Sequence, residues 1–253
     1  MAATKAGMPA VPAWPPKSLP RLFVATSLGA GARVDLDAAQ ANYLGNVMRL
    51  KEGDRLLVFD GASGEWLAEV ADAGKKRMTL SVVEPTRPQE SVPDLWLAFA
   101  PVKKGRVDWL VEKAVELGVA RLLPVVTRRT IVDKLNLDRM RAHIIEAAEQ
   151  CGRTSLAGID EPVRLEAMLK ARDADRALYF ADESGGEPSV SAFRPGPALI
   201  LTGPEGGFTP DEAVLIRRAA NATAISLGPR ILRAETAALA AVAAWMSAAG
   251  DWR

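Results

Sequence analysis

The sequence predicts an α/β protein: a mostly parallel sheet with flanking helices, preceded by a small N-terminal β-barrel. Two patterns lead to this expectation. Short apolar stretches separated by turn residues run from about residue 55 to residue 83, a spacing typical of a small barrel. After residue 93, short apolar stretches alternate with longer helical ones, which is the pattern of βαβ units. The chain has 253 residues, enough for two domains that each bury a core.

We expect three segments along the chain. Residues 1–20 contain five prolines and should form a disordered or extended tail, because proline fits poorly into regular structure. Residues 21–86 form the β-barrel, and residues 87–253 form the α/β domain. Pro85, Pro88 and Pro93 mark the linker, since proline lacks the N–H group that helices and β-ladders require.

The barrel elements follow from the alternation of apolar and polar residues. We expect strands at Arg55–Phe59, 65–71 and 78–83, with a turn at Asp60 and Gly61 after the first. One helix, over residues 37–47, precedes them.

The elements of the second segment follow from apolar runs and helix-end signals. The sequence predicts strands at 95–100, 121–126, 198–201 and 224–227. It predicts helices at 107–117, 137–150 and 236–249, and Gly118 and Gly152 end the first two. The last of these is an alanine-rich helix, shorter than the roughly 20 residues that span a bilayer, so no membrane segment is expected.

Two glycine-bearing loops, 201–208 and 227–236, hold the most information about function. Each follows an apolar strand and leads into a helix. Gly203, Gly206 and Gly207 lack Cβ atoms, so a ligand can approach the backbone closely. Thr209, Pro210 and Glu212 then form a helix start with a capping box. We expect the loops to be two walls of one ligand site, at the carboxyl ends of adjacent parallel strands.

Several common chemistries are excluded by missing parts. Neither G-x-G-x-x-G nor G-x-x-x-x-G-K-[ST] occurs at these loops, so a dinucleotide or a P-loop triphosphate is not expected. The chain has one histidine and one cysteine and lacks H-E-x-x-H and G-x-S-x-G motifs, so no metal site and no nucleophilic triad are expected. The single cysteine fits a reducing, cytoplasmic location. The net charge of +1 means that any RNA binding must use local patches.

The two loops resemble the signature loops of the ribosomal small-subunit methyltransferase E family, the 16S rRNA (uracil-N3)-methyltransferases. Four further segments resemble that family in the same order: 42–49, 59–61, 113–119 and 149–153. The resemblance implies a knotted α/β domain of the SPOUT class, a PUA-like barrel that binds RNA, and a homodimer. It also implies S-adenosyl-L-methionine as methyl donor and 16S rRNA or the small ribosomal subunit as substrate.

Candidate site residues are assigned from the two loops and from nearby basic residues. The candidate catalytic residues are Arg230, Arg233, Glu205 and Glu235. The candidate donor-binding residues are Leu201, Thr202, Gly203, Pro204, Gly206, Gly207, Leu227, Gly228, Ile231, Leu232 and Thr236. The candidate RNA-binding residues are Arg21, Arg49, Lys103, Lys104, Arg106, Arg128 and Arg153.

Each candidate also has a structural interpretation. Glu205 suits a role as acceptor of backbone N–H bonds within its own loop, and Glu235 suits the first turn of a helix, where a carboxylate complements the dipole. Two arginines at the same helix start are unfavourable for that dipole, so they indicate an anionic partner. His143 and Cys151 are expected to be packed structural residues.

Two other functions fit the same sequence features. One is a SPOUT methyltransferase that acts on another nucleotide, at a ribose 2′-hydroxyl or a tRNA base. The other is a non-catalytic RNA-binding protein, which would not need paired glycine loops. The alanine-rich last helix has almost no polar face, so we expect it to pack at a dimer interface.

Overall fold

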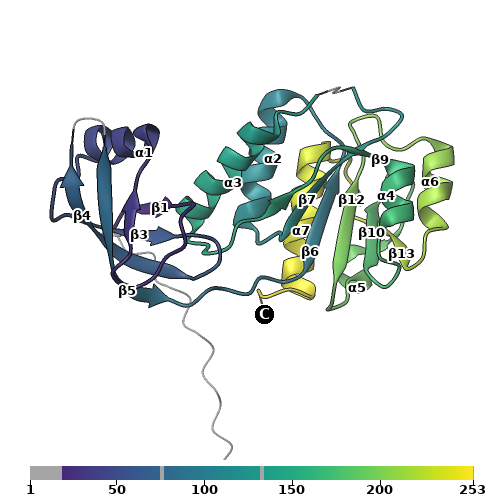
Figure 1. Ribbon diagram of the computed structural model, residues 1–253. Coiled ribbons are helices and arrows are strands. Elements are labelled where there is room, and N and C mark those ends of the chain that lie inside the picture. The colour runs from purple at the N-terminus through teal and green to yellow at the C-terminus, as the bar shows by residue number, and fades with distance from the viewer. Residues whose placement is uncertain (1–18, 75–76, 132–133, 253) are drawn as a thin grey trace, which may run out of the picture. The chain divides into compact units, whose positions relative to one another are not determined.

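The computed structural model describes residues 19–74, 77–131 and 134–252. The chain divides into two compact units, the first ending at Arg87 and the second beginning at Pro88 (Figure 1). Each unit has its own sheet and its own buried core. Most of the expected N-terminal tail, up to residue 18, lies outside the described residues.

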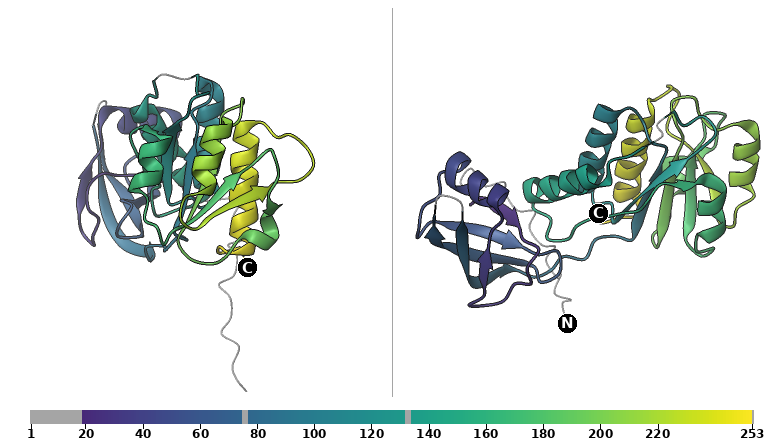
Figure 2. Two further views of the ribbon diagram at one scale, coloured as in Figure 1. Left: turned by 90° about the vertical axis from the view of Figure 1, so that its right-hand side faces the viewer. Right: turned by 45° about the horizontal axis from the view of Figure 1, so that its top comes forward.

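The first unit is a five-stranded curled sheet in the order β1-β3-β4-β5-β2 (Figure 2). β1 pairs in parallel with β3, and the other neighbours are antiparallel. Its elements are β1 (Arg21–Phe23), β2 (Arg33–Asp35), α1 (Ala38–Asn42), the π-helical turn η1 (Tyr43–Val47), β3 (Arg55–Phe59), β4 (Glu65–Ala73) and β5 (Met78–Arg87). Three register shifts between β4 and β5 bend this pair, which is how β-bulges curve a sheet.

The expected helix over residues 37–47 is confirmed as α1 followed by η1. Asp37 is its N-cap and forms a capping box with Gln40. Leu44 is fully buried and packs into the core of this unit, whose other members include Leu56, Val58 and Leu80 on alternate positions of β3 and β5. The period-2 alternation of the sequence therefore marks the buried face of the sheet.

The sequence places Pro85 in the linker, and the structure corrects this. β5 continues to Arg87, and Pro85 pairs with Trp66 of β4 next to a register shift. On its other side β5 pairs with β2 only at Thr79, Leu80 and Ser81. A proline is tolerated at such a position because its missing N–H group is not required by a second partner strand.

The second unit is a parallel sheet in the order β11-β13-β10-β12-β6-β7-β8, with β9 also paired to β7. Its strands are β6 (Leu95–Phe99), β7 (Arg121–Val126), β8 (Gly158–Ile159), β9 (Val163–Arg164), β10 (Ala177–Ala181), β11 (Glu187–Pro188), β12 (Ala198–Thr202) and β13 (Ala222–Ser226). Its helices are α2 (Lys104–Glu116), α3 (Leu137–Cys151), α4 (Leu165–Ala171), α5 (Ser189–Ala192), α6 (Pro210–Arg217) and α7 (Ala234–Ala248).

Helices cover both faces of this sheet (Figures 1 and 2). α4 and α6 cover one face, where Leu165, Met168 and Ile216 pack against strand residues such as Leu199 and Phe180. α7 contacts β6 and β12 on the other face, together with α2 and α5. None of the helices in the described part of the chain is long and apolar enough to cross a membrane.

The helix ends follow the residue types in the sequence. Gly152 ends α3 in the left-handed conformation with a φ of 84°, and Gly118, just after α2, has a φ of 95°. Thr209 caps α6, with Pro210 at its first position and Glu212 completing the capping box. These three helix signals are confirmed.

The order of the strands differs from the expected one in a way that matters for the site. The two strands before the glycine loops, β12 and β13, are not adjacent, because β10 lies between them and pairs with both. The site is therefore built at the carboxyl ends of three strands, and a third loop, after β10, enters it.

Candidate active site

A cavity of about 810 Å³ lies at the carboxyl ends of β10, β12 and β13. Three loops line it: residues 182–185 at the end of β10, residues 202–208 except Gly206 at the end of β12, and residues 226–233 at the end of β13. Arg129 also lines it, and one side of α6, from Pro210 to Arg217, and the first residues of α7 complete its wall. This is the edge of a parallel sheet where open α/β folds bind ligands.

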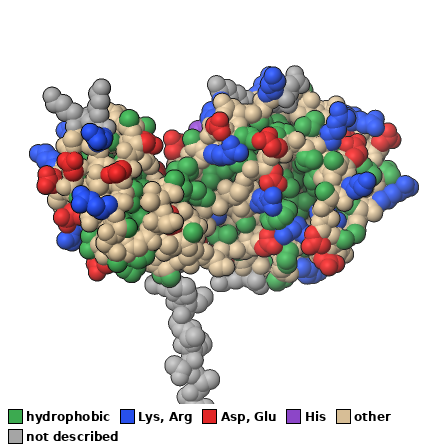
Figure 3. Space-filling model, viewed as in Figure 1, with side chains coloured by type: hydrophobic (Ala, Val, Ile, Leu, Met, Phe, Trp, Pro, Cys, Tyr) green, Lys and Arg blue, Asp and Glu red, His purple; other side chains and the backbone are tan. Residues whose placement is uncertain are grey.

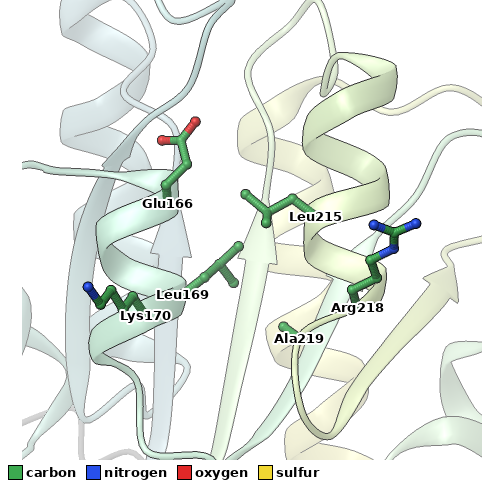
Figure 4. A pocket seen from close by; sticks show the side chains of 6 residues that line it. All are labelled: Glu166, Leu169, Lys170, Leu215, Arg218 and Ala219. Atoms are coloured by element: carbon green, nitrogen blue, oxygen red, sulfur yellow. The ribbon is translucent and has the colours of Figure 1, made fainter.

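A smaller pocket of about 250 Å³ lies between α4 and α6 (Figure 4). Leu169, Leu215 and Ala219 form its apolar part, with charged side chains around them. It has no glycine-lined backbone and lies away from the strand ends, so the larger cavity is the candidate active site.

The 202–208 loop is held from two sides. Within the loop, the Gly207 N–H donates to the Pro204 carbonyl at 2.9 Å, and Gly207 has a φ of 68° that favours glycine. From outside, the Arg129 guanidinium donates to the carbonyls of Gly206 and Phe208. A Cβ at Gly206 would meet the aliphatic chain of Arg129 at 3.3 Å, so this position faces Arg129 and does not line the cavity.

Glu212 joins the start of α6 to the end of β7. Its buried carboxylate accepts hydrogen bonds from the Thr209 N–H at 2.9 Å and from the Arg128 N–H at 2.8 Å. The capping box expected from sequence thus also fixes the chain that carries Arg128 and Arg129 beside the cavity.

The 226–233 loop presents exposed side chains at the cavity. Gly228 has a φ of 103° with open space where a Cβ would lie, and Ile231 is 94% exposed. Arg230 and Arg233 are both exposed and line the cavity. Arg233 is the N-cap of α7, which begins at Ala234, and its side chain makes no capping hydrogen bond. Arg230 and Arg233 thus place two cations shortly before the start of this helix.

The third loop, 182–185, is a part of the site that was not predicted from the sequence. The Asp182 carboxylate is buried and paired with Arg217, and Ser184 donates a hydrogen bond to it. Glu183 is exposed and lies beside Gly207. A signal for this loop exists, because the apolar run 177–181 is followed at once by Asp182, Glu183 and Ser184, polar residues of the kind found after a buried strand.

Arg106 brings two of the predicted catalytic residues together. Its guanidinium lies 3.6 Å from a Glu205 carboxylate oxygen and 3.6 Å from a Glu235 carboxylate oxygen. Glu205 lines the cavity, whereas Glu235 is buried in the first turn of α7. The four predicted catalytic residues are thus gathered at one place, but with different access to a ligand.

Most of the predicted donor-binding residues line the cavity. These are Thr202, Gly203, Pro204, Gly207, Leu227, Gly228, Ile231 and Leu232. Three do not. Leu201 is fully buried in the core between the sheet and helices α4 and α6, Gly206 faces Arg129, and Thr236 is exposed in the first turn of α7. A motif marks a whole segment, but only part of that segment lines the cavity.

The predicted RNA-binding residues divide by exposure. Arg153 is a correction: its side chain is buried and donates to the carbonyls of Val115 and Val119, so it joins α3 to the end of α2. Arg21 is largely buried against Glu65 and the Phe59 ring. Arg49, Lys103 and Arg128 are exposed, Arg106 is half-buried, and the side chain of Lys104 lies outside the described part of the structure.

Charged residues of both signs are interspersed over the visible face of the molecule (Figure 3). This agrees with the net charge of +1 and with local rather than extended basic patches. His143, the lone histidine, lies among carboxylates between α2 and α3, 3.0 Å from Glu112 and 3.5 Å from Glu146, and its place in this helix contact agrees with a structural role.

The fold and this site define a class of protein, and comparison with known proteins identifies it. A family model described as an RNA methyltransferase domain matches residues 88–246, and an RNA methyltransferase PUA domain matches residues 36–83. The chain is therefore an RNA methyltransferase with an N-terminal PUA-type unit, and the expected fold class, a mostly parallel sheet with flanking helices after a separate small β-domain, is confirmed.

Particular relatives narrow the class. The ribosomal RNA small subunit methyltransferase E of Rickettsia conorii is 32% identical over 228 residues, 88% of this chain and 93% of that protein. The protein of the same name from Synechocystis is 32% identical over 88% of this chain and 76% of its own length. The crystal structure of such a methyltransferase from Neisseria gonorrhoeae, bound to S-adenosyl methionine, superposes with a TM-score of 0.86 at 27% identity, over 93% of this chain and 100% of that one. The chain belongs to the ribosomal RNA small subunit methyltransferase E family.

Proposed function

We propose that the protein transfers a methyl group from S-adenosyl-L-methionine to N3 of a uridine in 16S rRNA, either as free rRNA or in the small ribosomal subunit, in the cytoplasm. The observation that carries this proposal is the cavity at the ends of β10, β12 and β13, lined by both signature loops. Family membership supports RNA methylation, and the resemblance in the signature loops supports uridine N3 as the target.

The cavity suits the donor in size and chemistry. Its volume of about 810 Å³ lies within the roughly 300–1,000 Å³ typical of small-molecule sites. The backbone of 202–204 and 226–228 offers N–H and C=O groups, and Leu227, Ile231 and Leu232 offer apolar contact for the adenine. Glu183 also lines the cavity, and its carboxylate can accept hydrogen bonds from ribose hydroxyls or pair with the donor's ammonium group.

When bound, S-adenosyl-L-methionine supplies an electrophilic methyl group. The chain must then align N3 of the uracil with that methyl group, and such alignment contributes roughly 7–11 kcal/mol in well-oriented systems. It must also help remove the N3 proton, a task for a carboxylate, and stabilise negative charge on the uracil, a task for arginine. Glu205, Arg230 and Arg233 line the cavity and provide both kinds of group.

Mass spectrometry of nucleosides tests the proposed reaction. Small subunits lacking the modification are incubated with the protein and the donor, and 3-methyluridine is the expected product. A different methylated nucleoside would reassign the target within the SPOUT class. Absence of both methylation and donor binding would favour a non-catalytic RNA-binding protein.

A pair of variants tests the role of the arginines at the start of α7. Arg233→Ala should slow methyl transfer by about 100-fold, the order seen when a stabilising donor is removed, while surface exposure limits its effect on stability to within about 0.5 kcal/mol. Arg218→Ala is the matched control, because Arg218 is also exposed but lines the smaller pocket. Equal rates for the two variants would remove Arg233 from the mechanism.

We further propose a SPOUT-type knot in the second unit and a homodimer. Support for the dimer comes from α7, whose Thr236, Ala240, Ala243 and Ser247 lie at helical spacing and keep some exposure. The larger part of α7 is already buried within the chain, against the sheet and α2. Light scattering at micromolar concentration tests the dimer, and a monodisperse monomer would contradict it.

A further inference from the structure

Arg106 stands between two carboxylates that come from separate elements. Arg106 lies in the first turn of α2, Glu205 in the loop after β12, and Glu235 in the first turn of α7. The guanidinium Nη1 is 3.6 Å from Glu205 Oε1, and its Nε is 3.6 Å from Glu235 Oε1. One planar cation thus bridges a helix start on one side and a cavity loop on the other.

The two carboxylates differ in their access to a ligand. The Glu235 side chain is 9% exposed and does not line the cavity, and its Oε2 atom is buried without a hydrogen-bond partner in the described part of the structure. The Glu205 side chain is 38% exposed and lines the cavity, and that of Arg106 is 39% exposed. A nucleotide in the cavity can therefore reach Glu205 but not Glu235.

Burial explains why this arrangement holds Arg106 in place. A buried carboxylate is costly unless a cation or hydrogen bonds compensate it. For Glu235 the compensation comes from the start of α7 and from the Arg106 guanidinium. Glu235 lies on a helix and attracts the guanidinium at 3.6 Å, and the guanidinium attracts the Glu205 carboxylate at the same distance.

The same arrangement argues against Arg106 as a phosphate contact. The Arg106 guanidinium is already paired with two carboxylates, which leaves it less available to an RNA phosphate. Arg106 is among the RNA-binding residues predicted from the sequence, and its contacts point instead to the two glutamates.

We propose that Arg106, anchored by the buried Glu235, is a positioning residue that orients Glu205 to accept the N3 proton of the target uridine. This inference rests on the proposed function. As the N3 proton passes to a Glu205 carboxylate oxygen, the N3–methyl bond forms and the sulfur–methyl bond of the donor breaks, with its electron pair staying on sulfur. S-adenosylhomocysteine and the methylated uridine leave, and Glu205 returns its proton to water. Glu235 acts only through Arg106.

Single-turnover methyl transfer with the full-length protein, together with calorimetric donor affinity, tests this. Arg106→Ala should lower the single-turnover rate by about 100-fold, the order expected for a misplaced catalytic group, and leave donor affinity within about twofold. Glu235→Gln should lower the rate as well. The double variant should be no slower than Arg106→Ala alone, because residues that act through one contact are not additive. Arg106→Lys should restore only part of the rate, since a lysine is a point charge without the guanidinium fork.

Two results would overturn the proposal. One is additivity, in which Glu235→Gln slows the Arg106→Ala protein by the same factor as it slows the wild type. The other is an Arg106→Ala protein that loses donor affinity and keeps its single-turnover rate, which would mean that Glu205 binds the donor rather than accepting the proton. Arg141→Ala, which removes an exposed pair on α3, serves as the control and should change neither quantity.

Amide hydrogen exchange separates this proposal from the proposed function. If the wild type makes no 3-methyluridine, the proposed function fails. Hydrogen exchange in residues 203–208 of the donor-free protein still tests whether Arg106 holds the loop that carries Glu205 in position. Faster exchange there in both Arg106→Ala and Glu235→Gln supports the positioning role. Unchanged exchange in both variants contradicts it.

Discussion

At the scale of single residues, Gly207 shows how the 202–208 loop depends on one backbone conformation. Its φ is 68°, and a Cβ there would lie 2.4 Å from a Glu183 carboxylate oxygen. We predict that Gly207→Ala lowers stability by about 1–2 kcal/mol from the left-handed backbone alone, and that it weakens donor binding because Glu183 must move. Calorimetric titration with the donor measures the second effect.

Gly152→Ala is the matched control for that substitution. Gly152 has a φ of 84°, and a Cβ there would meet nothing within 4 Å; the residue lies at the end of α3, outside the cavity lining. It should show the loss of stability without the loss of affinity. Equal donor affinities in the two variants would contradict a role for Glu183 in the site.

Glu65 makes the stability of the first unit depend on pH. Burial alone raises the pKa of Glu65, but hydrogen bonds from Arg87 and Arg21 outweigh it, and its pKa is lowered. Because folding lowers this pKa, the ionised carboxylate stabilises the fold at any pH above the ordinary glutamate pKa. This stabilisation is lost as the pH falls through the lowered pKa of the folded protein. Glu65→Gln should therefore cost about 3 kcal/mol at pH 7, the low end for breaking a buried pair.

Urea unfolding followed by tryptophan fluorescence at neutral and acidic pH checks the prediction for Glu65. The difference between the wild type and Glu65→Gln should shrink as the pH is lowered through the acidic range. Glu69→Gln is the control, since its pair with Arg55 is 3.4 Å long and its side chain is 41% exposed. A difference that does not change with pH would show that lost packing, rather than charge, explains the cost.

Residue roles were predictable from sequence where local chemistry decides them. The Thr209 capping box and the glycines that end α2 and α3 depend on neighbours along the chain. Arg153 was not predictable in this way. Its burial depends on carbonyls of Val115 and Val119, which no local pattern connects to it.

At the scale of elements, the edge strand β11 supports the third loop of the site. A Cβ at Gly186, just before β11, would lie 2.4 Å from the Ala224 carbonyl oxygen of β13. Backbone cannot give way as a side-chain end can, so Gly186→Ala should separate β11 from β13. The neighbouring loop 182–185 should then move, and we expect weaker donor binding in calorimetry and a lower melting temperature.

Gly158→Ala provides the control at the opposite edge of the same sheet. Gly158 lies in β8, and the nearest atom to a Cβ there is Arg121 Cγ at 3.5 Å, an ordinary contact. This variant should keep both donor affinity and melting temperature. If Gly186→Ala binds the donor as well as Gly158→Ala does, the edge strand does not support the site.

The elements themselves were mostly predictable, but their order in space was not. β3 matches the expected strand residue for residue, because alternation defines it. β10 was missed, although it lies between β12 and β13 and carries a site loop. Strand order in a parallel sheet depends on long crossovers, and these leave no local pattern in the sequence.

At the scale of the whole molecule, the two units have separate cores. We predict that a protein of residues 88–253 keeps the donor affinity of the full chain, because all residues lining the cavity lie after Pro88. It should lose methyl transfer to small subunits if the first unit binds RNA. Full-rate methylation by the shorter protein would show that the first unit is dispensable for substrate binding.

The chain is fastened on both sides of the boundary between the units. Arg87 pairs with Glu65 in the first, and the Glu90 carboxylate accepts hydrogen bonds from the Thr154 and Ser155 N–H groups in the second. Pro88 and Gln89 connect these two anchored ends, so the connection between the units is short. If both units contact the RNA, as the proposed function requires, binding by one unit raises the effective concentration of that RNA at the other, and two weak interactions add up to a stronger one. A longer connection between the units would lower that effective concentration and so weaken substrate capture.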